Sequence, residues 1–210
     1  MRKLCFVLAT LIFFCCPPAK ASQGEFPSLD AFLKSTLQGE DRVSVEAKGD
    51  LNGDALEDWA GVIQRQKADV QQTTQLYVLL RLSQGGYRVA EKSMEAPVSG
   101  AGCCWVESLE INRASIFIQN NAKTATTMEA ATHQFKLYQG EWRLIGVKIY
   151  YDDHGTNTSL TTETDMNLLT GSVIIKKQKG ENKPVTRKNR KKFSTRLLKD
   201  FNFHNGFGTE

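Results

Sequence analysis

The sequence predicts a mainly β, α+β fold: an antiparallel sheet that curls into a sandwich or a partial barrel, with one short amphipathic helix near the amino terminus. Three observations support this prediction. β-rich runs recur along the chain at hairpin spacing, turn residues separate them, and no helical pattern lies between them. Strands joined in this way pair with their neighbours in the sequence and bury one face against another layer.

The first 21 residues have the three parts of a secretory signal peptide. Arg2 and Lys3 form a positive n-region, residues 4–16 are an unbroken apolar run, and residues 19–21 (Ala-Lys-Ala) supply the small side chains that a signal peptidase reads. This apolar run is shorter than the roughly 20 residues that span a bilayer. We expect an exported protein, periplasmic or secreted, that begins near Ser22 and has no transmembrane segment.

Removal of this signal changes the charge balance. The whole chain has a formal charge of +4, and residues 1–21 contain three Lys/Arg and no acid. Residues 176–210 contain 11 Lys/Arg and three acids, a net charge of +8, which leaves a net charge of −7 on residues 22–175. The sequence therefore predicts an acidic body with a basic tail. Only two cysteines remain, so apolar burial must stabilise the fold.

The mature chain is expected to begin with a disordered lead over residues 22–27, followed by a β-rich domain over residues 28–178. Ser28 can cap a helix that has Asp30 in its first turn, where the helix dipole favours an anion. The apolar residues that follow share one face, and a glycine ends the segment at residue 39. We expect an amphipathic helix over residues 29–38 that packs on a larger element.

The remaining elements are predicted to be strands. Their ranges are 43–48, 59–66, 76–82, 87–92, 105–111, 115–119, 128–138, 142–151, 160–167 and 172–177. Short turns that contain glycine or asparagine join four successive pairs of these runs, which predicts hairpins. Apolar side chains occur on both faces of residues 142–151, which indicates a central strand or a register shift at Gly146.

The basic tail is predicted over residues 179–210. Its candidate anion-binding residues are Arg187, Lys188, Arg190, Lys191 and Lys192. Clustered cations dock on anionic lipid head groups, cell-wall polymers or nucleic acid, and export argues against nucleic acid. The alternative is a solvated segment that lies against the acidic body. Apolar residues after residue 192 have helical spacing, so the tail is expected to end in a short helix or an edge strand.

The most informative local motif is residues 49–58, Gly-Asp-Leu-Asn-Gly-Asp-Ala-Leu-Glu-Asp. Oxygen ligands would come from four side chains and one backbone carbonyl: Asp50, Asn52, Asp54, Leu56 (the carbonyl) and Asp58. Calcium takes about six to eight oxygen ligands, and a tight loop of alternating acids brings them to one point. The alternative is a turn whose side chains accept hydrogen bonds from its own backbone amides.

This motif resembles the loops of FG-GAP and VCBS-type repeats, which run Gly-Asp-x-Asn-Gly-Asp-Gly-x-x-Asp and lead directly into a strand. The resemblance covers residues 49–91 and implies a bound structural calcium ion and an extracellular or cell-surface binding role. Ala55 stands where the repeats have glycine, so a left-handed backbone there would be strained. A single copy does not imply a propeller, and Gly61 stands where an EF-hand needs an acid.

Cys103 and Cys104 are adjacent and are the two cysteines of the mature chain. A vicinal disulfide, pairing between molecules and burial as free thiols are three alternatives. The flanking segment 100–102 (Gly-Ala-Gly) permits the tight loop that a vicinal disulfide requires. The sequence places no base beside these thiols, which argues against a catalytic cysteine.

The enzyme classes that leave clear motifs are not indicated, because no nucleophile elbow, zinc-helix motif, phosphate loop or dinucleotide fingerprint occurs. We expect a non-enzymatic binding or structural protein whose partner is another protein, for instance an immunity-type module that blocks a toxin or an enzyme. The alternative is an exported hydrolase that uses acids of the 50–58 loop and of the turn Asp152-Asp153-His154. That turn is also a weaker candidate for metal binding.

Overall fold

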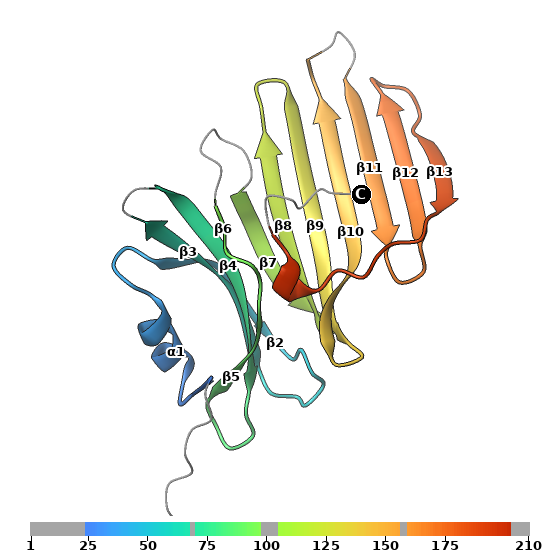
Figure 1. The fold of residues 1–210 in the computed structure, drawn as a ribbon. Coiled ribbons are helices and arrows are strands. Elements are labelled where there is room, and N and C mark those ends of the chain that lie inside the picture. Colours follow the sequence, from blue (N-terminus) through green and yellow to red (C-terminus); the bar gives the residue numbers. More distant parts are fainter. Residues whose placement is uncertain (1–23, 68–69, 98–104, 156–158, 203–210) are drawn as a thin grey trace, which may run out of the picture.

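Two antiparallel sheets and one α-helix make up the fold, which confirms the predicted fold class (Figure 1). The computed structural model describes residues 24–67, 70–97, 105–155 and 159–202. The predicted signal peptide and the pair Cys103-Cys104 lie outside the described residues. The two sheets form a sandwich in which one sheet reaches well beyond the other.

Sheet A has the strand order β1-β5-β4-β3-β2, and β6 also pairs with β4. Its strands are β1 (Glu25–Phe26), β2 (Arg42–Gly49), β3 (Asp58–Lys67), β4 (Val70–Arg81), β5 (Tyr87–Lys92) and β6 (Ala96–Pro97). Residues 25 and 26 pair with β5 and therefore belong to the sheet rather than to the predicted disordered lead. Extended residues next to an open strand edge gain backbone hydrogen bonds there, which explains the difference.

Sheet B has the strand order β13-β12-β11-β10-β9-β8-β7, in which every strand pairs with its neighbours in the sequence. Its strands are β7 (Trp105–Asn112), β8 (Ser115–Lys123), β9 (Thr127–Tyr138), β10 (Glu141–Asp153), β11 (Leu160–Asn167), β12 (Ser172–Lys179) and β13 (Val185–Arg190). The register of β9 and β10 shifts between Leu144 and Gly146, as predicted at this glycine.

Helix α1 (Leu29–Thr36) covers the outer face of sheet A. Ser28 caps it by accepting a hydrogen bond of 3.1 Å from the backbone N–H of Ala31. Phe32 is buried and packs edge-on against the rings of Trp59 and Tyr77, with centroid distances of 5.8 and 5.5 Å. The amphipathic stripe predicted for residues 29–38 therefore has the sheet as its partner.

The main apolar core lies between the two sheets. It includes Val62 and Val78 from sheet A and Ile118 and Phe135 from sheet B, all fully buried. The sheets approach each other most closely at β2 and β7, where a side chain on Gly49 would lie 2.7 Å from Ile111. Both faces of sheet A are thus covered, one by α1 and one by sheet B.

The segment 191–202, here called the C-terminal strap, returns from β13 across sheet B to sheet A (Figure 1). It contains the 3₁₀ helix η1 (Leu198–Asp200). The carbonyl of Arg196 accepts a hydrogen bond of 2.9 Å from the amide of Leu144 in β10, and the carbonyl of Phe201 accepts one of 3.2 Å from the amide of Met94. Leu198 is fully buried, so the strap fills the core as well as bridging the sheets.

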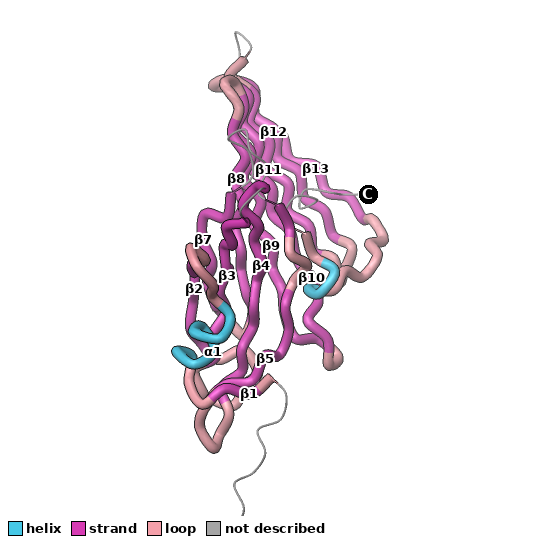
Figure 2. The backbone as a smooth tube through the Cα atoms, turned by 60° about the vertical axis from the view of Figure 1, so that its left-hand side comes forward, coloured by secondary structure: helices cyan, strands magenta, loops and turns pink. Residues whose placement is uncertain are grey.

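Strands β11 to β13 extend away from sheet A, as the views in Figures 1 and 2 both show. β13 is an edge strand whose side chains are all exposed. The predicted boundary between domain and tail, after residue 178, falls within β12, because the basic segment continues the sheet by pairing with β12. Residues 185–190 of the basic tail form this edge strand, and the 3₁₀ helix η1 lies in the later segment for which the sequence predicts a short helix or an edge strand.

Candidate functional site

The loop between β2 and β3 is held together by its own acidic side chains. The carboxylate of Asp50 accepts hydrogen bonds from the backbone amides of Gly53 (2.7 Å), Ala55 (3.0 Å) and Asn52 (3.2 Å). These bonds, that from Gly53 above all, hold the pKa of Asp50 below its usual value. Ala55 has a φ of 64°, so this alanine adopts the left-handed conformation that the repeat loops give to glycine.

Asp58 connects this loop to the neighbouring strand. It is fully buried, and its two carboxylate oxygens accept hydrogen bonds of 2.8 Å from the amides of Leu51 and Arg81. Burial raises the pKa of Asp58, and the charges of Asp54 and Asp50 raise it further. The three carboxylates are therefore close enough to repel one another.

The arrangement of the loop is that of a turn capped by its own side chains. Asp54 accepts hydrogen bonds from the Leu56 amide (2.8 Å) and the Asn52 side chain (2.9 Å). No group of three or more His, Cys, Asp or Glu side chains with metal-site spacing occurs within the described part of the chain. A bound cation would relieve the repulsion at Asp58, but the hydrogen bonds alone already order the loop.

The turn at residues 152–154 contains a small polar cluster. The Nε2 atom of His154 lies 3.1 Å from Asp152 Oδ2, and the hydroxyl of Tyr150 donates a hydrogen bond of 3.3 Å to the same carboxylate. Burial, followed by the Asp152 charge, raises the pKa of Tyr150. This turn and the 50–58 loop lie at opposite ends of the molecule (Figure 1), so the two sets of acids do not form one site.

The cations of the tail gather at one corner of sheet B, formed by residues 176–192 and here called the basic corner. Lys176 makes an ion pair of 3.6 Å with Glu163. Seven other cations have no ion pair with an acidic residue in the described ranges: Lys177, Lys179, Lys183, Arg187, Lys188, Arg190 and Lys192. Lys191 Nζ lies 5.8 Å from the centroid of the Phe193 ring. β13 lies at the free edge of sheet B, and all its side chains are exposed.

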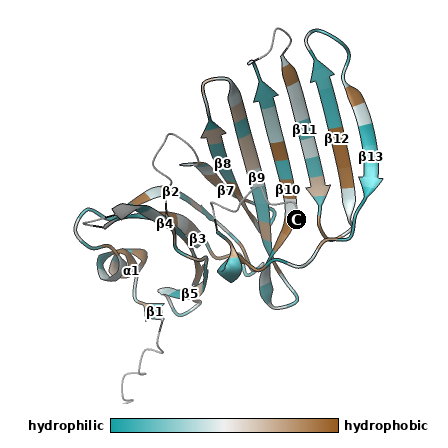
Figure 3. Ribbon diagram, turned by 45° about the horizontal axis from the view of Figure 1, so that its top comes forward, coloured by the Kyte–Doolittle hydropathy of each residue, from teal (hydrophilic) through white to brown (hydrophobic). Residues whose placement is uncertain are grey.

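The register of β12 and β13 divides these cations between two faces. Paired residues of an antiparallel ladder point to the same face. Arg187 pairs with Ile175, which lies on the inner face that continues the core, whereas Lys188 pairs with Ile174 on the outer face. In Figure 3 the C-terminal ends of β12 and of β13 are hydrophilic, and the rest of each strand contains apolar residues.

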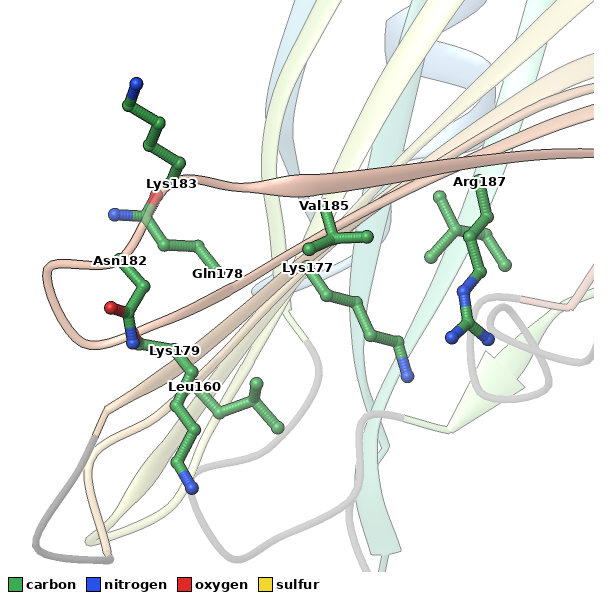
Figure 4. A pocket seen from close by; sticks show the side chains of 9 residues that line it. Leu160, Lys177, Gln178, Lys179, Asn182, Lys183, Val185 and Arg187 are labelled. Carbon is green, nitrogen blue, oxygen red and sulfur yellow. The ribbon is translucent and has the colours of Figure 1, made fainter.

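A hollow of about 380 Å³ lies on the inner face of the basic corner. Its lining residues are Leu160, Ile175, Lys177, Gln178, Lys179, Asn182, Lys183, Val185 and Arg187. In the close-up of Figure 4, Lys177, Lys179 and Arg187 extend from one side of the sheet, and Lys183 points away from them. The sequence analysis identified Arg187 alone among these residues, because the others become neighbours only through the strand register.

Neither a protein-family model, nor a curated protein, nor a solved structure matches the chain. The described helices include none that is long and apolar enough to cross a membrane. We therefore base the proposed function on the geometry of the basic corner and of the acidic loop.

Proposed function

We propose that this chain is an exported, non-catalytic binding protein that binds an anionic partner through the basic corner of sheet B. The proposal depends mainly on the seven cations that have no acidic partner among the residues that the structure describes, set against Glu181 as the one acid in the sequence of residues 176–192. Each is exposed at an edge of the sheet that sheet A does not cover.

A basic edge strand also has a general use, because lysines on an edge discourage pairing with other chains. One or two charged side chains on the strand are sufficient to prevent such pairing. The basic corner has cations on both faces of β13, on β12 and in the turn between them. A surface of this charge attracts anions over roughly one Debye length, about 8 Å at physiological salt, and steers them to the site.

The acidic loop has a structural part in this proposal. If calcium binds there, the ligands are Asp50, Asn52, Asp54, Asp58 and the carbonyl of Leu56. The mutual repulsion of the carboxylates supports this assignment, because a divalent cation would remove it. The ion would tie the start of β3 to β4 through Asp58.

The test compares two triple variants with the same change of charge. One replaces Arg187, Lys188 and Arg190 by glutamate, and the control replaces Lys34, Arg88 and Lys92, which are exposed on α1 and β5. Mature protein is applied to immobilised dextran sulfate, and retention is measured against salt concentration. We expect the basic-corner variant to lose retention at a salt concentration where the control and the wild type still bind.

Equal losses in the two triple variants would contradict the proposal, because retention would then report net charge rather than a surface. Circular dichroism and thermal melting of each variant verify that the fold is intact. Because all six residues are exposed, the substitutions are expected to change stability little.

A further inference from the structure

We infer that the hollow at the basic corner binds an amphipathic anion: a phosphate or carboxylate head joined to an alkyl chain. This inference rests on the proposed function and specifies the ligand of the same surface. It follows from the residues that stand beside the cations rather than from the cations themselves.

Cations and apolar side chains alternate across the inner face of this corner. Ile175 pairs with Arg187, Val185 with Lys177, and Leu160 with Lys179. Side chains paired across a ladder have their Cβ atoms about 4.5–5.5 Å apart. Each of these three cations therefore has an apolar side chain as its direct neighbour, and all six residues line the hollow.

Two of the three apolar side chains at the hollow, Val185 and Leu160, are not explained by the core, whereas Ile175 packs against it. Val185 is 61% exposed, and neither Val185 nor Leu160 belongs to the two apolar clusters of the protein. An exposed valine at the end of a basic strand contributes little to folding. It would gain from burial under an alkyl chain, at about 25 cal/mol for each Å² of apolar surface removed from water.

The outer face of the same strands has a different composition. Lys188 and Arg190 pair there with Ile174 and Ser172, and Lys176 is already paired with Glu163. The outer face thus offers charge with little apolar surface. A free inorganic anion or a sulfated polymer would bind to either face, whereas an amphiphile would bind preferentially to the inner face.

The volume of the hollow limits the ligand. About 380 Å³ is near the lower end of the range of roughly 300–1,000 Å³ for small-molecule sites. The hollow therefore accommodates a head group and the first part of one chain. Such a ligand has two sources, a monomeric amphiphile in solution or a lipid that remains in a membrane.

The experiment titrates the mature protein with decyl phosphate below its micelle concentration, with inorganic phosphate, and with decyl maltoside as the uncharged control. We expect decyl phosphate to bind at least about tenfold more tightly than inorganic phosphate, the factor that burial of about two methylene groups provides. Decyl maltoside is expected not to bind measurably. Equal affinities for the two phosphates, together with no Val185-dependent binding to anionic vesicles, would overturn the inference.

Matched pairs of substitutions locate the site. Lys177→Gln with Arg187→Gln, on the inner face, should abolish binding of decyl phosphate, whereas Lys188→Gln with Arg190→Gln, on the outer face, should leave it within about twofold. Val185→Ser should reduce the advantage of the decyl chain and leave phosphate binding unchanged. Since Val185 is exposed, this variant is expected to fold. Equal effects of the inner and outer pairs would overturn the inference.

Vesicles of phosphatidylglycerol and of phosphatidylcholine distinguish the two sources. Both sources support the inference: binding to the monomer identifies a free amphiphile, and binding to anionic vesicles alone, sensitive to Val185→Ser, identifies a membrane lipid. Failure of the inference is separate from failure of the proposed function. If neither the alkyl chain of decyl phosphate nor Val185→Ser on anionic vesicles has an effect, but retention on dextran sulfate still depends on the basic corner, the proposed function stands and this inference is wrong.

Discussion

Sheet A and the β11–β13 end of sheet B are built from similar strands but differ in what covers them. Sheet A is buried on both faces, under α1 on one side and sheet B on the other. At the basic corner the side chains of β13 are exposed on both faces. The chain thus separates its apolar burial from its charge, and we attribute stability to the first region and binding to the second.

The largest expected effect tests this separation directly. Trp59→Ala removes a fully buried indole whose Nε1 donates a hydrogen bond of 2.6 Å to Glu46, and it should cost about 3–5 kcal/mol of unfolding free energy. Val185→Ala at the basic corner should change that free energy by no more than about 0.5 kcal/mol. Urea denaturation measures both. Similar losses would mean that the corner contributes to stability as sheet A does.

A smaller effect is expected at the junction of the acidic loop with sheet A. In Asp58→Asn, one of the two backbone amides that donate to the carboxylate would face an N–H₂ group, which cannot accept its hydrogen bond. We therefore expect the free energy of unfolding to fall by about 1–3 kcal/mol. Asp165→Asn on the exposed part of β11 is the matched control and should be nearly neutral. Thermal melting in the presence of a chelator measures the difference without any contribution from metal. An unchanged midpoint for Asp58→Asn would show that these two hydrogen bonds do not stabilise sheet A.

Calcium should stabilise the sheet A side of the molecule if the loop binds it. At a calcium concentration ten times the dissociation constant, the gain is about 1.4 kcal/mol, which for a chain of this size raises the melting temperature by about 3–6 °C. Asp54→Asn, which alters an exposed ligand, should abolish the shift. Identical melting temperatures of the wild-type protein with calcium and with chelator would contradict calcium binding at this loop.

The smallest effect is expected at Glu129, which lies on the inner face of sheet B opposite Tyr151. Burial raises the pKa of Glu129, so its neutral form is favoured in the folded protein. The stability that this carboxyl contributes is therefore complete below its unfolded pKa and is lost as the pH rises through its folded pKa.

Glu129→Gln should remove this pH dependence, and the melting temperature relative to wild type should rise between pH 4 and neutral pH. Glu163→Gln on the outer face is the control, since Glu163 is paired with Lys176. A parallel pH profile for wild type and Glu129→Gln would contradict the assignment.

Local patterns were sufficient to predict the hairpins, because each depends on residues close together in the sequence. Gly85 and Gly86 both have positive φ at the turn from β4 to β5, and Gly140 does so between β9 and β10. The division into two sheets was not predictable in the same way. It depends on contacts between distant segments, such as Gly49 with Ile111 and Arg196 with Leu144.

The same limit applies to the candidate sites. The acids of the 50–58 loop were predictable as a group, but the hydrogen bond that the amide of Arg81 donates to Asp58 joins residues 23 positions apart. At the basic corner, the run of cations was evident in the sequence. The hollow was not, because Leu160, Lys177 and Val185 become neighbours only when the register of three strands is known.

The C-terminal strap has a consequence for the timing of folding. Leu198 and Phe201, which complete the interior between the sheets, follow every strand of both sheets in the chain. While those residues are missing, Phe135 and His133 lack the ring that packs on each of them at 4.9 Å. A nascent chain therefore cannot finish its core until the residues that follow β13 have been synthesised.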